Sequence, residues 1–294
     1  MISSTSKSKP GKYTKLLQVR TSSSIHSCNG YNSDAGESSE LERRKVYQWL
    51  DGIDPSSLHH RACNQYEAGT GDWVLRSDDW KAWISGKKRA LWIHGIPGAG
   101  KTVLTSHLIE TIKRHCSDET TKKKNACVYY YCYFGHNIDE ASPFLKWIVR
   151  QLCLIADVVP DKLYKLYKRG ESPSLIDLLQ VLDEITETFD HIYIILDAID
   201  ESTPRLDLLR ILRDLITDPR FQKIYVIATS REYIDIEESM KDISSAISMS
   251  NPLLDQDIQL FVQAQLQSHP KLRLWPSSVR DMAMEALSTK AKGM

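Results

Sequence analysis

Apolar and polar residues follow one another in blocks along most of the chain. Short runs that are apolar almost throughout are separated by longer stretches in which apolar residues recur every three or four positions. Strands that are apolar on both sides are typical of a parallel sheet with helices on both faces. The pattern therefore predicts an α/β fold. The predicted strands are Arg89–His94, Ala126–Phe134, the apolar start of His191–Glu201, Lys223–Glu232 and Ser245–Ser250.

Helical spacing predicts helices between and around these strands. They span residues 102–115, 143–156, 174–189 and 206–216, and the spacing is helical again from Asp255 onwards. Residues 73–84 are predicted to form one short helix capped by Ser77. Residues 1–40 are rich in small polar residues and are predicted to be disordered, because they cannot bury enough apolar surface. The expected segments are a disordered stretch (1–40), a helical lead-in (41–88), an α/β core (89–252) and the start of a helical domain (253–294).

Composition narrows the class of partner. Thirty-eight Lys and Arg residues balance 38 Asp and Glu residues, so net charge does not favour nucleic acid or an anionic membrane. No stretch approaches the roughly 20 apolar residues that span a bilayer. The six cysteines contain no C-x-x-C pair, which favours reduced thiols in a cytoplasmic protein. We therefore expect neither a nucleic-acid partner nor a membrane partner.

A glycine-rich segment joins the first predicted strand to the next helix. Its sequence GIPGAGKT fits G-x-x-x-x-G-K-[ST], the pattern of a phosphate-binding loop. Such a loop points backbone N–H groups at a phosphate, which requires positive φ angles that glycine adopts readily. Lys101 is expected to reach the β- and γ-phosphates, and the Thr102 hydroxyl is expected to bind Mg²⁺. The predicted nucleotide contacts here are Gly95, Ile96, Pro97, Gly98, Ala99, Gly100, Lys101, Thr102 and Val103.

Charged residues follow two later strands. Asp197 ends the run IILD, which places its carboxylate beside the phosphate loop, where it can hold Mg²⁺ directly or through water. Asp200 and Glu201 come just after it, and one of them can orient or deprotonate an attacking water. Arg231 follows the next strand, where a cation can sense the γ-phosphate. The alternative for these residues is a solvated acidic turn and an arginine that faces solvent.

Three of these motifs together resemble a known family. GIPGAGKT, ILDAIDE and IATSRE, in this order and spacing, resemble the NACHT branch of the STAND P-loop NTPases. The upstream GTGDWVLRSDDWKAWI and the downstream SNPLLDQDIQLFV resemble fungal NACHT proteins of the nephrocystin-like type. The resemblance covers residues 41–294. Many NTPases share the phosphate loop, whereas DAIDE and GTGDW are much more specific.

The resemblance implies both a fold and an activity. The fold is a P-loop NTPase core of three αβα layers, with five parallel strands in the order 5-1-4-3-2, followed by a helical domain. The activity is that of a switch between an ADP-bound closed state and an ATP-bound oligomeric state, with Mg²⁺, slow hydrolysis of ATP and, in fungi, a role in innate immunity and self/non-self signalling.

The resemblance also implies roles for individual residues. By the family's pattern Lys101 and Thr102 bind phosphate and Mg²⁺, Asp197 binds Mg²⁺, Asp200 is the water activator and Arg231 is the sensor. The GTGDW stretch is expected close to the base or ribose. Its predicted contacts are Gly69, Thr70, Gly71 and Trp73.

The sequence leaves open both the extent of the module and whether it hydrolyses nucleotide. The sequence stops inside the helical region, before any winged helix, so we expect a fragment, a truncated product or a minimal NACHT module. Self-association, or contact with other NACHT or receptor chains, is then expected through apolar residues near the end: Leu260, Phe261, Leu266, Met282 and Leu287. A non-hydrolysing scaffold is the main alternative. A small-molecule kinase is disfavoured, because no acid follows the second strand and no arginine-rich lid is evident.

Overall fold

The computed structural model describes residues 33–50, 52–118, 120 and 123–290. Internal contacts divide the chain into residues 1–41 and 42–294, and the α/β fold lies in the second part. Of the segment predicted to be disordered, residues 1–32 lie outside the described residues. Residues 33–40 are helical, contrary to the prediction, because α1 spans Ser33–Trp49. Once a helix has nucleated, each further residue adds a hydrogen bond, so a helix extends beyond the apolar positions that predict it.

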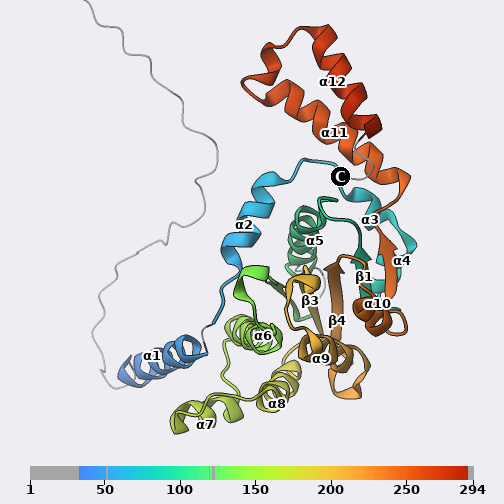
Figure 1. Cartoon of the computed structure of the whole chain (residues 1–294). Helices are drawn as coiled ribbons and strands as arrows, with labels where there is room; N and C mark the ends of the chain where they lie inside the picture. The colour runs from blue at the N-terminus through green and yellow to red at the C-terminus, as the bar shows by residue number, and fades with distance from the viewer. Residues whose placement is uncertain (1–32, 51, 119, 121–122, 291–294) are drawn as a thin grey trace, which may run out of the picture. The chain divides into compact units, whose positions relative to one another are not determined.

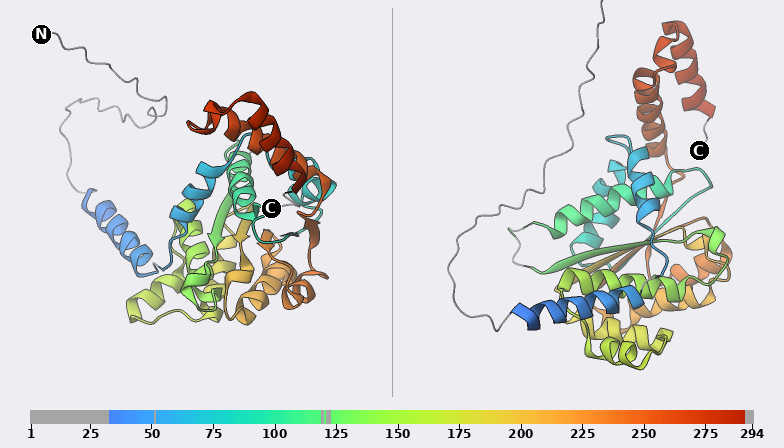
Figure 2. Two further views of the ribbon diagram at one scale, coloured as in Figure 1. Left: turned by 45° about the horizontal axis from the view of Figure 1, so that its top comes forward. Right: turned by 90° about the vertical axis from the view of Figure 1, so that its left-hand side faces the viewer.

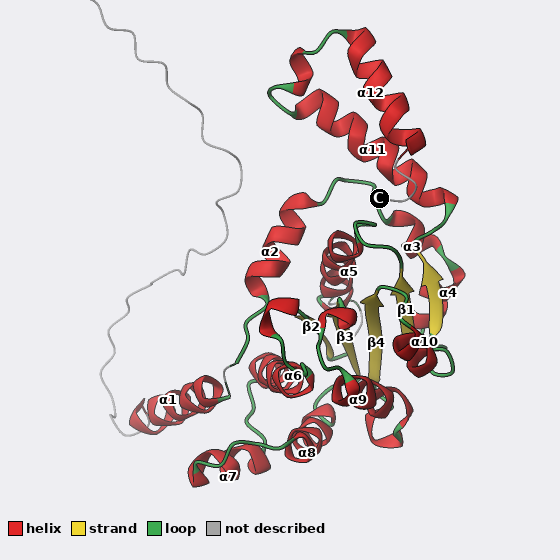
Figure 3. Cartoon of the chain, in the orientation of Figure 1, coloured by secondary structure: helices red, strands yellow, loops and turns green. Residues whose placement is uncertain are grey.

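Five parallel strands form the centre of the fold (Figure 3). They are β1 (Ala90–His94), β2 (Asn125–Tyr131), β3 (His191–Asp197), β4 (Ile224–Ser230) and β5 (Ser245–Ser248). Their order across the sheet is β2-β3-β4-β1-β5, and all four pairings are parallel. The predicted α/β class and the strand order 5-1-4-3-2 are confirmed. Since the strands all point the same way, His94, Asp197 and Ser230 end up at one edge of the sheet.

Three strands end earlier than predicted. β2 stops at Tyr131 rather than Phe134, β4 at Ser230 rather than Glu232 and β5 at Ser248 rather than Ser250. Ala198, with a φ angle of 57°, turns the chain out of β3 directly after Asp197. The N–H of Cys132 donates to the Asp197 carbonyl over 3.0 Å, and beyond it β2 gives way to a short 3₁₀ helix, Phe134–His136. The apolar pattern of β2 could not reveal where its neighbour turns away.

Successive residues of each strand face opposite sides of the sheet and build two apolar cores. In β3, Ile194 and Leu196 lie in the first core, and Tyr193 and Ile195 lie in the second. Figure 2 shows the sheet with helices on both faces. The first core includes residues of α6 (Ala141–Ala156), α8 (Leu175–Thr186) and α9 (Leu206–Thr217), and the second those of α3 (Asp72–Arg76), α4 (Asp78–Ile84) and α5 (Lys101–Cys116). The predicted three-layer arrangement therefore holds.

Several helices differ from the sequence prediction. The single helix predicted over residues 73–84 is two helices, α3 and α4, because Ser77 is extended and its side chain accepts the Trp80 N–H at 3.1 Å. Two short helices were not predicted, α7 (Asp161–Arg169) and α10 (Ile234–Met240), and a third, α2 (Ser56–Gln65), was covered only by the general helical lead-in over residues 41–88. Helices this short are marginal by themselves and form where tertiary packing holds them.

Two helices follow the sheet and pack against each other (Figure 1). They are α11 (Pro252–Ser268), which the Asn251 side chain caps, and α12 (Ser277–Lys290). Leu260, Phe261, Met282 and Leu287 are exposed, as predicted, but Leu266 is only 6% exposed. The prediction for Leu266 was wrong because Leu266 shares the buried face of α11 with Val262, one turn earlier.

Two further sequence expectations concern the described residues as a whole. Within these ranges no helix combines the length and the apolar character needed to cross a bilayer. The five cysteines in the described part of the chain are free thiols, and Cys28 lies outside it.

Candidate functional site

The glycine-rich loop connects β1 to α5, as predicted. Its first residue is fixed to the neighbouring strand, because the Gly95 N–H donates to the Ser230 carbonyl over 3.2 Å. Gly98 and Gly100 have φ angles of 82° and 83°, which side-chain-bearing residues rarely adopt. These angles let the loop curl over the first turn of α5. The N-terminus of a helix attracts anions through its free N–H groups and its dipole.

Lys101 places its amine inside this loop. Its Nζ donates to the carbonyl oxygens of Gly95 at 2.8 Å and Ile96 at 2.9 Å. Burial lowers the pKa of the Lys101 ammonium, while the negative charges of Asp200 and Asp197 oppose that shift. The one lysine of the motif is therefore held by weak acceptors, and anionic phosphate oxygens are stronger acceptors for it.

Asp197 lies at the end of β3 and is only 2% exposed. Its Oδ1 accepts the hydroxyl protons of Thr105 at 2.8 Å and Thr229 at 2.6 Å. Burial raises the pKa of the Asp197 carboxyl, and hydrogen bonds from Thr229, Thr105 and Thr102 offset part of the shift. Hydroxyl and carboxylate oxygens are ligands that suit Mg²⁺, so the pair Thr102 and Asp197 fits the metal role that the sequence predicts.

The two threonines that hold Asp197 were not predicted as site residues. Thr105 lies on α5, one turn after Thr102, and its hydroxyl oxygen also lies 2.9 Å from the Lys101 carbonyl oxygen. Thr229 accepts the Ala198 N–H at 3.0 Å, while its hydroxyl donates to Asp197. Thr229 thereby fixes both the carboxylate and the turn that follows it. The sequence offered one signal for Thr229, because it stands two residues before Arg231 at the end of the same strand.

Asp200 and Arg231, predicted to act on water and on the γ-phosphate respectively, contact each other. Arg231 Nε lies 3.2 Å from Asp200 Oδ2, and the Arg231 N–H donates to Asp200 Oδ1 over 3.1 Å. Asp200 is buried, whereas the Arg231 side chain is 41% exposed. The ion pair therefore joins the turn after β3 to the end of β4 at the edge where the phosphate loop lies.

Glu201 offers a second carboxylate at the same turn. Its Oε2 accepts the Phe134 N–H at 3.2 Å. Burial raises the pKa of the Glu201 carboxyl, and the charges of Asp200 and Asp197 raise it further. A carboxylate with a raised pKa is better suited to accept a proton from water than an ordinary one. Both acids that the sequence singled out therefore lie in this region.

A pocket of about 740 Å³ adjoins the phosphate loop. Of the predicted nucleotide contacts it is lined by Thr70, Gly71, Trp73, Gly98, Ala99, Gly100 and Val103. Gly69, Gly95, Ile96, Pro97, Lys101 and Thr102 are not among its lining residues. Tyr66 and, from α11, Leu254, Ile258 and Phe261 add apolar wall. Its size and its apolar lining are typical of a small-molecule site.

Asp257 also lines this pocket. It was not predicted from the sequence as a site residue. Its Oδ2 accepts the Gly71 N–H at 2.7 Å and the Trp73 indole N–H at 3.0 Å. Burial raises the pKa of the Asp257 carboxyl, which the same two donors partly oppose. Asp257 therefore ties α11 to the GTGDW stretch. A separation of 186 residues from Gly71 left no local sequence signal for this contact.

Comparison with known proteins assigns the chain to a family. A family model described as Nephrocystin 3, N-terminal, matches residues 69–231, which is more than half of the chain. The chain belongs to this family. The matched residues of this nephrocystin-type chain run from GTGDW to Arg231, so they hold the phosphate loop, Asp197 and the Asp200–Arg231 ion pair together.

A curated fungal relative supports the same assignment. The Vegetative incompatibility protein HET-E-1 of Podospora anserina is 28% identical over 208 residues. These residues are 67% of the present chain and 15% of the relative, so the chain spans a small part of that protein's length. The predicted resemblance to fungal, nephrocystin-like NACHT proteins is confirmed. The nephrocystin-type chain is a NACHT-like module with a phosphate-loop motif between β1 and α5.

Solved structures with a similar chain path are more distant. The Aeropyrum pernix ORC2 protein, solved as ADPNP–ADP complexes, is 14% identical with a TM-score of 0.44, covering 71% of this chain and 53% of its own. Domain III of the Thermotoga maritima replication initiation protein DnaA is 13% identical with a TM-score of 0.41, covering 80% and 82%. Similarity this low gives no indication of function for the nephrocystin-type chain.

Proposed function

We propose that the chain is a nucleotide-operated switch module that binds ATP or ADP with Mg²⁺ and hydrolyses ATP slowly. One observation carries this proposal: Lys101, the buried Asp197 and the Asp200–Arg231 ion pair meet at one edge of the sheet, beside a pocket of about 740 Å³. In the proposed orientation of the nucleotide, its phosphates lie at the loop and its base lies in the pocket that Trp73 and Tyr66 line.

The phosphate end of the proposed site uses charge and hydroxyl groups of this chain. On binding, the Lys101 amine exchanges its two loop carbonyls for phosphate oxygens, and the N-terminus of α5 supplies further N–H donors. Thr102 and Asp197 would hold Mg²⁺, which neutralises charge that develops on the phosphate oxygens when it is bound. Thr105 and Thr229 keep the Asp197 carboxylate in one orientation toward that position.

Hydrolysis of ATP would require an acidic side chain that orients the attacking water, and the site offers two. Asp200 is oriented by Arg231, and Glu201 is oriented by the Phe134 N–H. We propose Asp200 as the residue that orients or deprotonates water, with Arg231 sensing the γ-phosphate. The Asp200–Arg231 contact also favours one second candidate, a scaffold that binds nucleotide without turnover. Arg231 engages both carboxylate oxygens of Asp200, Oδ2 through its side chain and Oδ1 through its backbone N–H.

Calorimetry on the full chain tests the binding proposal. Lys101→Ala is expected to weaken ATP and ADP affinity by roughly 1.5–3 kcal/mol, since it removes a charge-assisted contact to phosphate. Lys165→Ala, at an exposed lysine of α7, is the matched control and should bind as the parent does. Equal affinity in the parent and Lys101→Ala would remove the basis of the proposal.

The cellular role proposed here rests on the fungal relative, whose name describes vegetative incompatibility. We propose that this module belongs to a cytoplasmic NOD-like receptor system that signals in self/non-self recognition, with other NACHT or receptor chains as partners. Replacing the gene by its Lys101→Ala form in the source organism should abolish an incompatibility response that the parent gene supports. An unchanged response would separate the module from this signalling role.

A further inference from the structure

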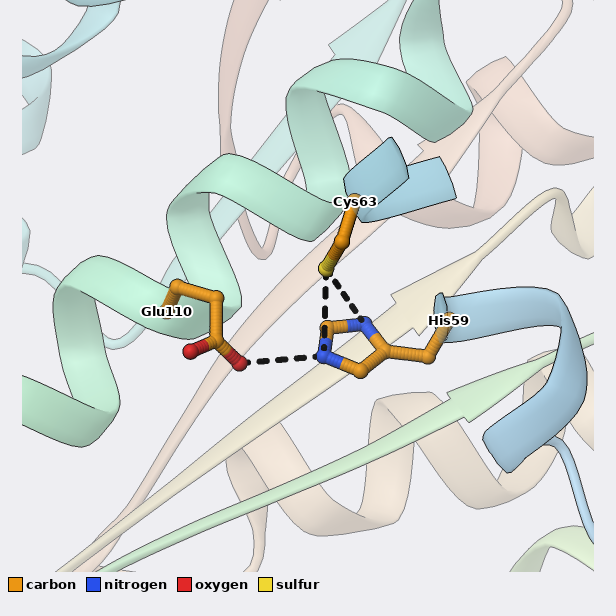
Figure 4. A group of neighbouring side chains, drawn as sticks. All are labelled: His59, Cys63 and Glu110. Carbon is orange, nitrogen blue, oxygen red and sulfur yellow. Dashed lines mark hydrogen bonds and ion pairs between the residues drawn. The ribbon is translucent and has the colours of Figure 1, made fainter. Parts of the chain in front are cut away.

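Three side chains with metal-binding atoms meet between α2 and α5 (Figure 4). His59 and Cys63 lie four residues apart on α2, so both project from one face of that helix. Glu110 reaches them from α5. Their ligand atoms all lie within 4.8 Å of one another. The proposed nucleotide site uses none of these three residues.

We propose that His59, Cys63 and Glu110 form a binding site for a divalent transition metal of the zinc type, which joins α2 to α5. His59 Nε2 lies 3.0 Å from Glu110 Oε1, and Cys63 Sγ lies 3.6 Å from the same nitrogen. Tetrahedral zinc with bonds of roughly 2.0–2.3 Å separates its ligand atoms by about 3.3–3.6 Å. Both distances to His59 Nε2 are therefore close to those that a metal requires. Cys63 Sγ also lies 3.9 Å from His59 Nδ1, so the Cys63 side chain has to turn toward Nε2 when a metal binds.

The surroundings of His59 orient it as a ligand. Its Nδ1 lies 3.0 Å from the hydroxyl of Tyr131, at the end of β2, and the ring is only 3% exposed. A partner on one ring nitrogen fixes the orientation and leaves the other nitrogen for the metal.

The ligand set and the access route favour zinc over magnesium or calcium. One sulfur, one imidazole nitrogen and one carboxylate oxygen suit softer transition metals, whereas Mg²⁺ and Ca²⁺ prefer oxygen alone. A second pocket, of about 730 Å³, has Cys63 and Glu110 in its wall together with Ser106. Solvent can therefore reach the site, and water can complete the four ligands.

Lys113 competes for the same position. Its Nζ lies 2.8 Å from Glu110 Oε1 and 3.5 Å from His59 Nε2. The cluster thus already attracts a positive charge. The Lys113 side chain is 38% exposed, so its ammonium can move into solvent when a metal binds. Removing that ammonium, as in Lys113→Met, should therefore tighten metal binding.

Cobalt(II) absorption on the reduced, chelator-treated full chain tests the site. We expect one equivalent of Co²⁺ to produce a thiolate-to-metal charge-transfer band, which one equivalent of Zn²⁺ removes. Cys63→Ser should abolish the band, and Glu110→Gln, at a half-exposed position, should weaken binding by about tenfold or more. Cys116→Ser, at another free cysteine, is the matched control and should keep the band.

Thermal unfolding gives a second readout that needs no nucleotide. Zn²⁺ should raise the Tm of the parent and of Cys116→Ser, because it binds the folded chain. It should raise the Tm of Glu110→Gln by less and leave that of Cys63→Ser unchanged. A band that persists in Cys63→Ser, or weaker binding in Lys113→Met, would overturn the proposed site. So would the absence of a charge-transfer band at one equivalent of Co²⁺ in a parent chain that is folded.

Discussion

The Asp197 carboxylate is buried, and one of its oxygens accepts hydroxyl protons from Thr105 on α5 and Thr229 on β4. Because burial raises its folded-state pKa above 3.8, ionisation costs stability, and the cost grows as the pH rises through the folded pKa. Asp197→Asn is uncharged at every pH and its carbonyl can still accept both hydroxyls. It should therefore be more stable than the parent at neutral pH by about 1 kcal/mol, roughly 2–4 °C in Tm.

Thermal unfolding between acid and neutral pH checks this prediction, and the gain should shrink toward acid pH. Asp235→Asn is a control of opposite sign, because a hydrogen bond from Arg205 lowers the pKa of Asp235 and its ionised form stabilises the fold above that pKa. Mg²⁺-dependent nucleotide binding should be lost only in Asp197→Asn. A less stable Asp197→Asn would show that the carboxylate contributes to the fold as a charge.

At Asp200 and Glu201 the question is which acid serves hydrolysis. Asp200→Asn should keep nucleotide affinity and lower the ATP turnover rate by about 10²-fold, the usual contribution of a general base. Glu201→Gln is the matched comparison at the adjacent position. Single-turnover measurements with both variants decide between them: an unchanged rate in Asp200→Asn would transfer the role to Glu201 or to no residue.

At the scale of the elements, two hydrogen bonds to Asp257 connect α11 to the GTGDW stretch. Asp257→Ala leaves the Gly71 and Trp73 N–H groups without their acceptor, which costs about 1–3 kcal/mol per buried group lost. We expect weaker adenine-nucleotide affinity, because Trp73 lines the proposed base pocket. Urea unfolding and calorimetry measure the two effects.

Asp255→Ala, at an exposed position in the first turn of the same helix, is the control for that change. It should alter stability by only a few tenths of a kcal/mol through the helix dipole. If Asp255→Ala and Asp257→Ala behave alike in both measurements, Asp257 acts through the helix alone and not through the pocket.

At the scale of the molecule, the paired helices α11 and α12 expose several large apolar side chains. Leu260 is 44% exposed, Met282 70% and Leu287 52%. Clustered exposed apolar residues favour association, so the mass of the full chain in solution should rise with concentration in the micromolar range. Leu260→Glu with Met282→Glu should shift it toward the monomer.

Light scattering coupled to size exclusion measures this association. Ile176→Glu, at an exposed apolar residue of α8 that is 68% exposed, is the matched control and should associate as the parent does. A sharp monomer at every concentration, or equal effects of both charge substitutions, would contradict association through α11 and α12.

The sequence by itself determined the α/β class, the five strands and the phosphate loop. Each of these depends on residues that are neighbours in the chain: apolar runs that suit a buried parallel strand, and glycines followed by Lys101–Thr102 at a strand–helix junction. The strand order also followed, through motifs whose spacing resembles one family. Asp197 was identified for the same reason, because the end of a parallel strand has a fixed place at the edge of the sheet.

The tertiary structure alone decided which distant side chains meet. Thr105 and Thr229 converge on Asp197, Asp257 reaches Gly71, and Arg231 pairs with Asp200, all across separations that leave no periodic signal. The short helix α2 also depends on packing, since ten residues gain too few hydrogen bonds to hold a helix by themselves. Its His59 and Cys63 therefore acquired a partner in Glu110 only when the sheet placed α5 beside it.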